Sequence, residues 1–281
     1  MAAAIGLLAC AGGSRLERGD HPPAASTVGP AATVAASAPV PFPALSASGP
    51  VVDERGATSA RAQSTAPEPS ASGAVAAPSG RCPQDMVDVA LACIDRYEAP
   101  NRAGEKPLVM QSLPDAESWC REHGKRLCTE DEWLRACRGR PERSWAYPYG
   151  PTYQEHACNQ DAKYIPPSWQ RLGRWPADEA KAEVARLNQA EPSGARPTCV
   201  TPEGVFDLTG NVGEWIVRQH PHPEACLTPE QEQHQHVVKG CFWGKCYRVP
   251  HEPACDYVNC SHPDGFRSYE FGFRCCRDAQ R

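Results

Sequence analysis

The chain has 281 residues and a formal net charge of −5, and its lysines and arginines form no run, so nothing favours nucleic acid as a partner. The seven tryptophans and every cysteine except Cys10 follow residue 80. This uneven distribution predicts one folded unit of about 200 residues in the C-terminal part of the chain.

The first ten residues read MAAAIGLLAC and end in Leu-Leu-Ala-Cys, which is typical of a bacterial lipoprotein signal. We expect residues 1–10 to be that signal and Cys10 to carry the lipid. No stretch reaches the roughly 18–20 apolar residues that span a bilayer, so a lipid anchor is the one expected membrane attachment. The segment is short and lacks a basic region, and a chance alanine-rich terminus is the alternative.

Residues 11–80 consist largely of Ala, Pro, Ser and Gly, and Phe42 is their one aromatic residue. Such a segment buries too little apolar surface to offset its chain entropy, which predicts a disordered tether. The folded domain is accordingly expected over residues 81–281.

Cysteine usage is the strongest signal in that domain. The fifteen cysteines less Cys10 leave an even fourteen, a density typical of disulfide-bonded exported proteins. A cytosolic zinc protein is the alternative, but no C-x2-C pair recurs. We therefore expect an extracytoplasmic protein, in the periplasm or at the cell surface.

Secondary structure is expected to be sparse and mixed. Interleaved apolar residues predict a strand or hairpin over residues 82–98, and helical spacing predicts a helix over residues 115–123. Thr129 and Glu132 form a capping-box pattern, which predicts a second helix that ends near Gly139.

The rest of the domain shows little periodicity. We expect an exposed helix over residues 177–187 and short strands over residues 204–208, 214–217, 237–239 and 271–275, with an irregular loop over residues 219–236. The fold class predicted is α+β, with little regular structure and many disulfides.

Several strings in this domain resemble, in order and spacing, those of the formylglycine-generating enzyme (sulfatase-modifying factor) family. They are GKRLCTEDEWLRACRG (124–139), YPYG (147–150), CN (158–159), GVFDLTGNVGEW (204–215), VVKG (237–240) and GFRC (272–275). The resemblance covers nearly all of residues 82–278. It implies the C-type-lectin-like fold of that family, with two helices packed on short twisted sheets.

The same resemblance implies a disulfide framework. Family members pair the first-helix cysteine with the cysteine of GFRC, and the second-helix cysteine with one upstream of it. This implies the bonds Cys120–Cys275 and Cys137–Cys255. Further expected pairs are Cys128–Cys276, Cys82–Cys93 and Cys158–Cys199, whereas the pairing of Cys226, Cys241, Cys246 and Cys260 stays open.

Enzymes of this family convert a cysteine of an unfolded sulfatase segment to formylglycine, using oxygen and copper(I) held by two cysteines spaced C-x4-C before Tyr-Arg. Cys241 and Cys246 have this spacing and precede Tyr247-Arg248. They are the expected catalytic residues and copper ligands, since soft thiolates suit copper(I). Here, however, Cys241 follows Gly240 directly, unlike in the family.

Two functions therefore stand. The first is a copper-dependent oxidase that acts on a cysteine of a protein or peptide. The second is a non-catalytic, surface-tethered module of the same fold that binds a protein or glycan, with Cys241 and Cys246 held in structural disulfides, Cys226 and Cys260 being available partners.

The resemblance also implies calcium, bound through the side chains of Asn211 and Glu214 and the carbonyl of Val212, with Asn159 at a further site. Hard oxygen ligands suit calcium. In the alternative, Asn211 caps a turn and Glu214 pairs with a basic residue. A zinc site among the histidines between His220 and His262 is also left open.

Overall fold

The computed structural model describes residues 80–244, 246 and 253–280. Cys10, the expected signal and nearly all of the expected tether lie outside these residues, as do Tyr247 and Arg248. In the described part of the chain, no helix has the length and apolar character of a membrane span.

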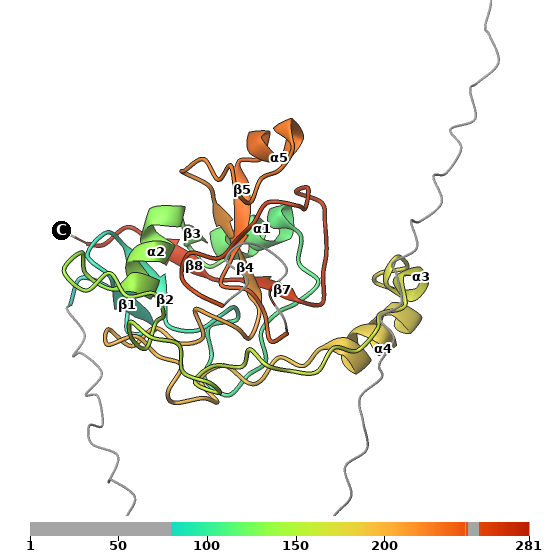
Figure 1. Ribbon diagram of the computed structural model, residues 1–281, viewed down its shortest axis with the longest axis horizontal. Coiled ribbons are helices and arrows are strands. Elements are labelled where there is room, and N and C mark those ends of the chain that lie inside the picture. Colours follow the sequence, from blue (N-terminus) through green and yellow to red (C-terminus); the bar gives the residue numbers. More distant parts are fainter. Residues whose placement is uncertain (1–79, 245, 247–252, 281) are drawn as a thin grey trace, which may run out of the picture. The chain divides into compact units, whose positions relative to one another are not determined.

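Short strands and helices make up the domain (Figure 1). The strands are β1 (Met86–Asp88), β2 (Cys93–Asp95), β3 (Arg126–Leu127), β4 (Gly213–Val217), β5 (His236–Lys239), β6 (Val258–Asn259), β7 (Phe271–Phe273) and β8 (Cys275–Arg277). The helices are α1 (Leu113–Glu122), α2 (Glu130–Arg138), α3 (Trp169–Leu172), α4 (Asp178–Leu187) and α5 (Pro229–Gln233). This mixture agrees with the expected α+β class.

Two four-stranded sheets organise these elements. The strand order is β1-β2-β8-β3 in one sheet and β6-β5-β4-β7 in the other. Neighbouring strands are antiparallel except β4 and β7, which run parallel. The expected hairpin at residues 82–98 is present as β1 and β2, and the disulfide Cys82–Cys93 closes it.

The expected closing strand at residues 271–275 is in fact two strands that belong to different sheets. β7 pairs with β4, whereas β8 pairs with β2 and β3. Arg274 stands between them and is fully buried, where its guanidinium bonds Glu214 of β4. The chain therefore crosses from one sheet to the other at a buried ion pair. The apolar pattern of residues 271–275 predicts a single strand and does not show this crossing.

The expected strand at residues 204–208 is not formed. The described chain has only an isolated bridge here, between Val200 and Phe206. Gly204 and Asp207 have φ values of +94° and +58°. Such left-handed residues interrupt the extended backbone that a strand requires.

Both main helices begin at side-chain caps. The backbone N–H of Thr129 donates to Glu132 Oε2 at 2.8 Å, which confirms the expected capping box of α2. α1 begins at Leu113, two residues before its expected start, because Ser112 and Asp115 form a second capping box.

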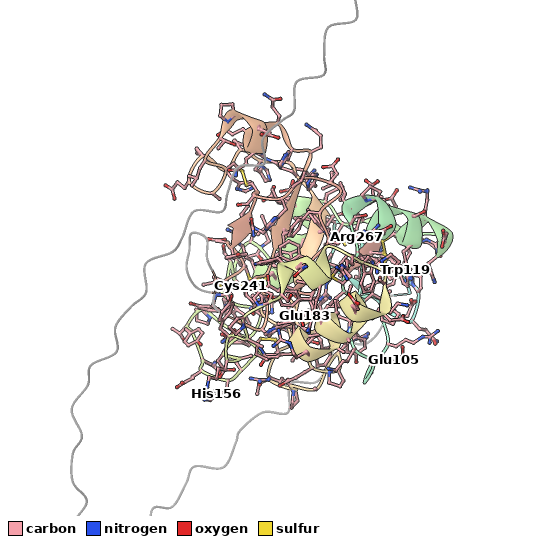
Figure 2. All side chains as sticks on the ribbon, turned by 90° about the vertical axis from the view of Figure 1, so that its right-hand side faces the viewer. Glu105, Trp119, His156, Glu183, Cys241 and Arg267 are labelled. Atoms are coloured by element: carbon pink, nitrogen blue, oxygen red, sulfur yellow. A yellow bond between two sulfur atoms is a disulfide. The ribbon has the colours of Figure 1, made fainter. Side chains whose placement is uncertain are left out.

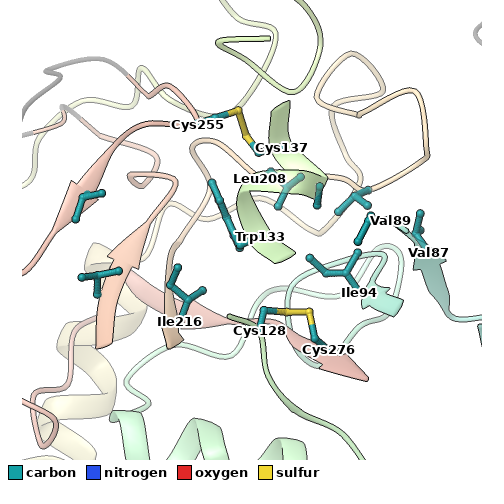
Figure 3. Close-up of a cluster of buried hydrophobic side chains, with 14 of the residues drawn as sticks. Val87, Val89, Ile94, Cys128, Trp133, Cys137, Leu208, Ile216, Cys255 and Cys276 are labelled. Atoms are coloured by element: carbon teal, nitrogen blue, oxygen red, sulfur yellow. A yellow bond between two sulfur atoms is a disulfide. The ribbon is translucent and has the colours of Figure 1, made fainter. Parts of the chain in front are cut away.

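Helix α2 packs its apolar face into a core shared by both sheets (Figure 3). Trp133 is fully buried there, and its indole N–H donates to Glu214 Oε2 at 2.8 Å. Two disulfides border this core: Cys137–Cys255 joins α2 to the segment before β6, and Cys128–Cys276 joins the residue after β3 to β8.

Seven disulfides include every cysteine of the described chain. The bonds Cys120–Cys275 and Cys137–Cys255 implied by the resemblance are both present, and so are Cys128–Cys276, Cys82–Cys93 and Cys158–Cys199. The four cysteines whose pairing the sequence left open form Cys226–Cys260 and Cys241–Cys246.

Candidate functional site

The candidate site begins where the chain leaves β5 in a tight turn. Gly240 has a φ of +83°, and a Cβ atom at this position would lie 2.6 Å from the carbonyl oxygen of Leu208. Only glycine fits such a close approach. Cys241 follows with a φ of +64° and turns the chain away from the sheet.

Cys241 and Cys246 are bonded to each other at the end of this turn. Their exposed fractions are only 1% and 3%. Because Cys226 is bonded to Cys260, the alternative in which these two residues pair with Cys241 and Cys246 is not realised. The two candidate copper ligands are therefore brought together as one pair.

Aromatic side chains surround the pair. Cys241 and Cys246 belong to an apolar cluster with Phe242, Trp243 and Tyr269, to which α3 and α4 contribute Leu172, Val184 and Leu187. Figure 2 labels Cys241 and, on α4, Glu183. A cavity of about 60 Å³ beside Trp243 has room for only a few water molecules. Glu270 lines this cavity, and burial raises the pKa of its carboxyl.

Asn211 hydrogen-bonds to the turn that begins at Gly240 and carries Cys241, hereafter the cysteine turn. Its carbonyl oxygen accepts from the backbone N–H of Trp243 at 3.0 Å. Its side-chain oxygen accepts from Asn159 Nδ2 at 3.1 Å and from the backbone N–H of Glu191 at 2.8 Å. Its side-chain amide donates to Glu98 Oε2 at 2.7 Å. Asn211 thus ties the cysteine turn to three other parts of the chain.

Two buried carboxylates beneath the turn were missed by the sequence analysis. Glu98 is fully buried and also accepts from the backbone N–H of Val212. Burial, together with the nearby charges of Asp207 and Glu214, raises the pKa of Glu98 well above its ordinary value. Burial likewise raises the pKa of Asp207 to about 6. No sequence pattern identifies Glu98 or Asp207 as part of the site, because only the fold brings these residues together.

The residues expected to hold calcium differ in the partners that their side chains bind. Asn159 and Asn211 are in contact, but their side chains bond each other. Glu214 directs both carboxylate oxygens at Arg274, with distances of 2.7–2.9 Å, and its side chain is 1% exposed. A cation at Glu214 would meet the positive charge of Arg274, so Glu214 does not fit a calcium site in this arrangement.

This geometry corresponds to the alternative in which Glu214 pairs with a basic residue. Within residues 80–244, 246 and 253–280, no group of three or more His, Cys, Asp and Glu side chains is arranged to hold a metal ion. A zinc site among the histidines therefore finds no support in the described chain.

Comparisons with known proteins agree with this arrangement of motifs. The model of the Sulfatase-modifying factor enzyme 1-like domain matches residues 51–279. The chain is 33% identical over 139 residues to Inactive C-alpha-formylglycine-generating enzyme 2 of Bos taurus, an alignment that covers 50% of this chain and 39% of that protein. It is 29% identical over 187 residues to the Formylglycine-generating enzyme of Mus musculus, which covers 61% and 44% respectively.

The chain thus spans about two fifths of the length of these curated relatives. Among solved structures, PvdO from Pseudomonas aeruginosa matches with 18% identity and a TM-score of 0.43, over 66% of this chain and 80% of that one.

Proposed function

The chain belongs to the sulfatase-modifying factor family, and from this premise we propose that it is an oxidase that converts a cysteine of a protein substrate to formylglycine. Cys241 and Cys246 would hold copper(I). One observation carries the proposal: these two residues pair with each other, in the family's C-x4-C spacing, whereas the other twelve described cysteines form six separate disulfides.

The position of this pair in the chain favours a redox role. Cys241 and Cys246 are 5 residues apart, whereas the partners of the other disulfides are separated by 11 to 155 residues. In the chain-entropy model a bond that closes so short a loop adds little to stability, so we expect the fold to survive reduction of this pair while the remaining disulfides stay intact. A structural bond in the same place would contribute comparatively little to stability.

The donor chemistry also suits copper. Reduction would leave two thiolates side by side, and soft thiolates are the ligands that copper(I) prefers. Bound copper(I) would supply the site at which a substrate thiolate and dioxygen meet. Phe242, Trp243 and Tyr269 would exclude water around the pair, and Asn211 would fix the turn through the backbone of Trp243.

The overall reaction balances with one further reactant. A substrate cysteine loses its sulfur and its β-carbon becomes an aldehyde, while dioxygen accepts four electrons. Two of these come from the substrate carbon and two from two molecules of a thiol reductant, and the other products are hydrogen sulfide, water and the disulfide of that thiol. The same class of thiol would reduce Cys241–Cys246 before copper binds.

A second candidate is a non-catalytic module that binds a protein or glycan. The burial of both sulfur atoms favours it, because a substrate thiolate needs access to the metal. Two curated relatives, from Bos taurus and Mus musculus, also bear the word inactive in their names. For calcium, Asn159, Asn211 and the Val212 carbonyl stay a prediction, which a chelator-dependent fall in thermal stability would support.

We also propose that the protein is exported and tethered through Cys10. Seven disulfides support an oxidising compartment, since such bonds are rare in the cytosol. The C-type-lectin-like arrangement of the family is likewise our proposal for this fold. Mass spectrometry of the membrane fraction would reveal lipid on Cys10, and an unmodified thiol there would contradict the tether.

Copper(I) binding tests the oxidase proposal without relying on turnover. The full chain is treated with a mild thiol and titrated with copper(I) against a competing chelator. We expect one tightly held copper ion in the wild type and none in Cys241→Ser/Cys246→Ser.

The matched control is Cys82→Ser/Cys93→Ser, which removes a different disulfide and should retain the copper ion. Equal copper binding by wild type and Cys241→Ser/Cys246→Ser would refute the assignment of the ligands and leave the binding module as the better account.

A further inference from the structure

A second and larger cavity lies against α2 and the end of β5. Its volume is about 580 Å³, compared with about 60 Å³ for the cavity beside Trp243, and the two share no lining residue. The charged side chains of Glu130, Arg135 and Lys239 and the imidazole of His222 line it, together with the apolar side chains of Leu91 and Leu134. The proposed oxidase reaction makes no use of these groups.

Lys239 brings a buried positive charge to this cavity. The residue is 1% exposed, and its Nζ lies 5.7 Å from the centre of the Trp133 ring. The nearest carboxylate oxygen, Glu130 Oε1, is 3.8 Å away, which is beyond hydrogen-bonding distance. No hydrogen bond from this ammonium to another described residue is formed. A buried ammonium in this state is costly unless something else binds it.

Arg135 adds a second cation on the same wall. Its Nη1 atom is buried and has no hydrogen-bond partner in the described part of the chain. Arg135 is one helical turn beyond Asp131 on α2, so its guanidinium reaches the cavity from the helix while Lys239 reaches it from the strand. Arg135 and Lys239, each with a nitrogen atom that forms no hydrogen bond in the described chain, thus line one cavity from different elements.

Most carboxylate groups of the cavity, by contrast, have partners. Asp256 pairs with Arg138, and Asp131 lies 2.6 Å from His220 Nε2. Glu130 Oε1 lies 2.7 Å from His222 Nε2, but neither of these two atoms has a partner with hydrogen-bond geometry. Glu130 also accepts from the backbone N–H groups of residues 219 and 220 at 3.2 Å. Among the cavity groups without a hydrogen bond in the described chain, the nitrogen atoms of Arg135, Lys239 and His222 outnumber the one carboxylate oxygen, Glu130 Oε1.

Apolar surface completes the cavity. Leu91 is 57% exposed at its rim, and Leu134 is partly buried. We propose that this cavity binds a carboxylate attached to an apolar group, with the carboxylate between Lys239 and Arg135 and the apolar group against Leu91 and Leu134. Charge-assisted hydrogen bonds from both cations would hold the carboxylate. A free small acid and the C-terminus of a peptide share this chemistry.

Calorimetric titration of the full chain with phenylacetate tests the proposal. We expect saturable binding of phenylacetate and much weaker binding of the neutral phenylacetamide. Removing one charge in Arg135→Met or Lys239→Met should raise the Kd on the order of tenfold, as expected when a charge-assisted hydrogen bond is lost. Lys106→Met, at an exposed lysine away from the cavity, is the matched control and should bind as the wild type does.

Arg135→Met keeps the test decisive if Lys239→Met fails to fold, because Arg135 is only half-buried. A short peptide that ends in phenylalanine with a free carboxylate, compared with its amidated form, distinguishes a peptide terminus from a free acid as the source. Absence of saturable phenylacetate binding would overturn the proposal. So would equal binding of acid and amide, or an unchanged Kd in the charge variants.

Discussion

Asp207, near the cysteine turn, is constrained in its backbone conformation, in its hydrogen bonding and in its charge. Its φ is +58°, a conformation that aspartate and asparagine tolerate better than most side chains. Its Oδ2 atom accepts from the backbone N–H of Gly194 at 2.7 Å. Because burial disfavours the charged form, the pKa of Asp207 rises from 3.8 to about 6. The buried charge of Asp207 therefore lowers the free energy of unfolding at neutral pH.

We expect Asp207→Asn to raise the free energy of unfolding at pH 7 by about 1–3 kcal/mol, since asparagine keeps the acceptor and removes the buried charge. With the folded pKa above the unfolded one, the cost is absent below about pH 3.8, grows as pH rises and is complete above about pH 6. The advantage of the variant should therefore vanish in acid. Urea denaturation at several pH values measures it.

The matched control is Asp178→Asn, at a carboxylate that is fully exposed on α4 and should change stability by less than about 0.5 kcal/mol. Lower stability of Asp207→Asn at pH 7 would show instead that the charge of Asp207 helps to hold Arg274.

Gly240 is the other residue with a sharp expectation. Alanine here would place a Cβ atom 2.6 Å from the Leu208 carbonyl oxygen in a left-handed conformation. We expect Gly240→Ala to lower the free energy of unfolding by at least about 2 kcal/mol and to reduce copper(I) affinity, because the turn that carries Cys241 must move. Gly265→Ala, where no atom lies within 4 Å, should have a small effect on both measurements. Wild-type stability in Gly240→Ala would contradict this account of the turn.

At the scale of the element, helix caps decide where the two packed helices begin. The Ser112–Asp115 box starts α1, which then presents Ala116 and Cys120 to the core. Ser112→Ala removes an N-cap and should lower the free energy of unfolding by about 1 kcal/mol. Ser118→Ala, in the middle of the same helix, should change it by less than about 0.5 kcal/mol. Chemical denaturation of both variants compares them, and equal losses would mean that the cap contributes nothing.

The longer helices α1, α2 and α4 and several strands could be expected from sequence because their signals are local, whereas α3, β3 and β6 were not expected and α5 lies in the segment expected to be an irregular loop. The capping pair of Thr129 and Glu132 and the apolar run before Gly240 each identify an element without knowledge of the rest. The change of sheet at Arg274 could not be predicted in this way. It depends on a buried partner, Glu214, that is 60 residues distant in the chain.

In the candidate site, too, local features could be predicted from sequence and tertiary contacts could not. The spacing of Cys241 and Cys246 is visible in sequence, and the structure brings the two residues together. Glu98 lies 113 residues from Asn211, and Lys239 lies far from Arg135 along the chain, so their contacts and shared cavity follow from tertiary packing alone. That Glu214 pairs with a basic residue was one of the two alternatives, but the sequence does not identify Arg274 as its partner.

On the scale of the whole molecule, disulfides contribute part of the stability of a domain that has little regular secondary structure. Cys120–Cys275 joins residues 155 apart, whereas Cys241–Cys246 joins residues 5 apart. In the chain-entropy model these bonds stabilise the fold by about 5 and about 2 kcal/mol respectively. The long bond ties α1 to β8, and the short one ties only a turn to itself.

Replacing each pair with serine tests this division. We expect Cys120→Ser/Cys275→Ser to lower the free energy of unfolding by several kcal/mol more than Cys241→Ser/Cys246→Ser does. Denaturant titration under oxidising conditions measures both. A larger loss for the Cys241 and Cys246 pair would indicate that their bond is primarily structural.

Turnover of a peptide is the most direct test of the proposed oxidase. The full chain, reduced with a mild thiol and loaded with copper(I), is incubated in air with a peptide that contains Cys-x-Pro-x-Arg, and mass spectrometry follows the peptide. The account predicts a product in which the cysteine CH2–SH has become an aldehyde, formed by the wild type and by Cys82→Ser/Cys93→Ser but not by Cys241→Ser/Cys246→Ser. An unchanged peptide after incubation with copper-loaded wild type, or equal conversion by the Cys241→Ser/Cys246→Ser variant, would contradict it.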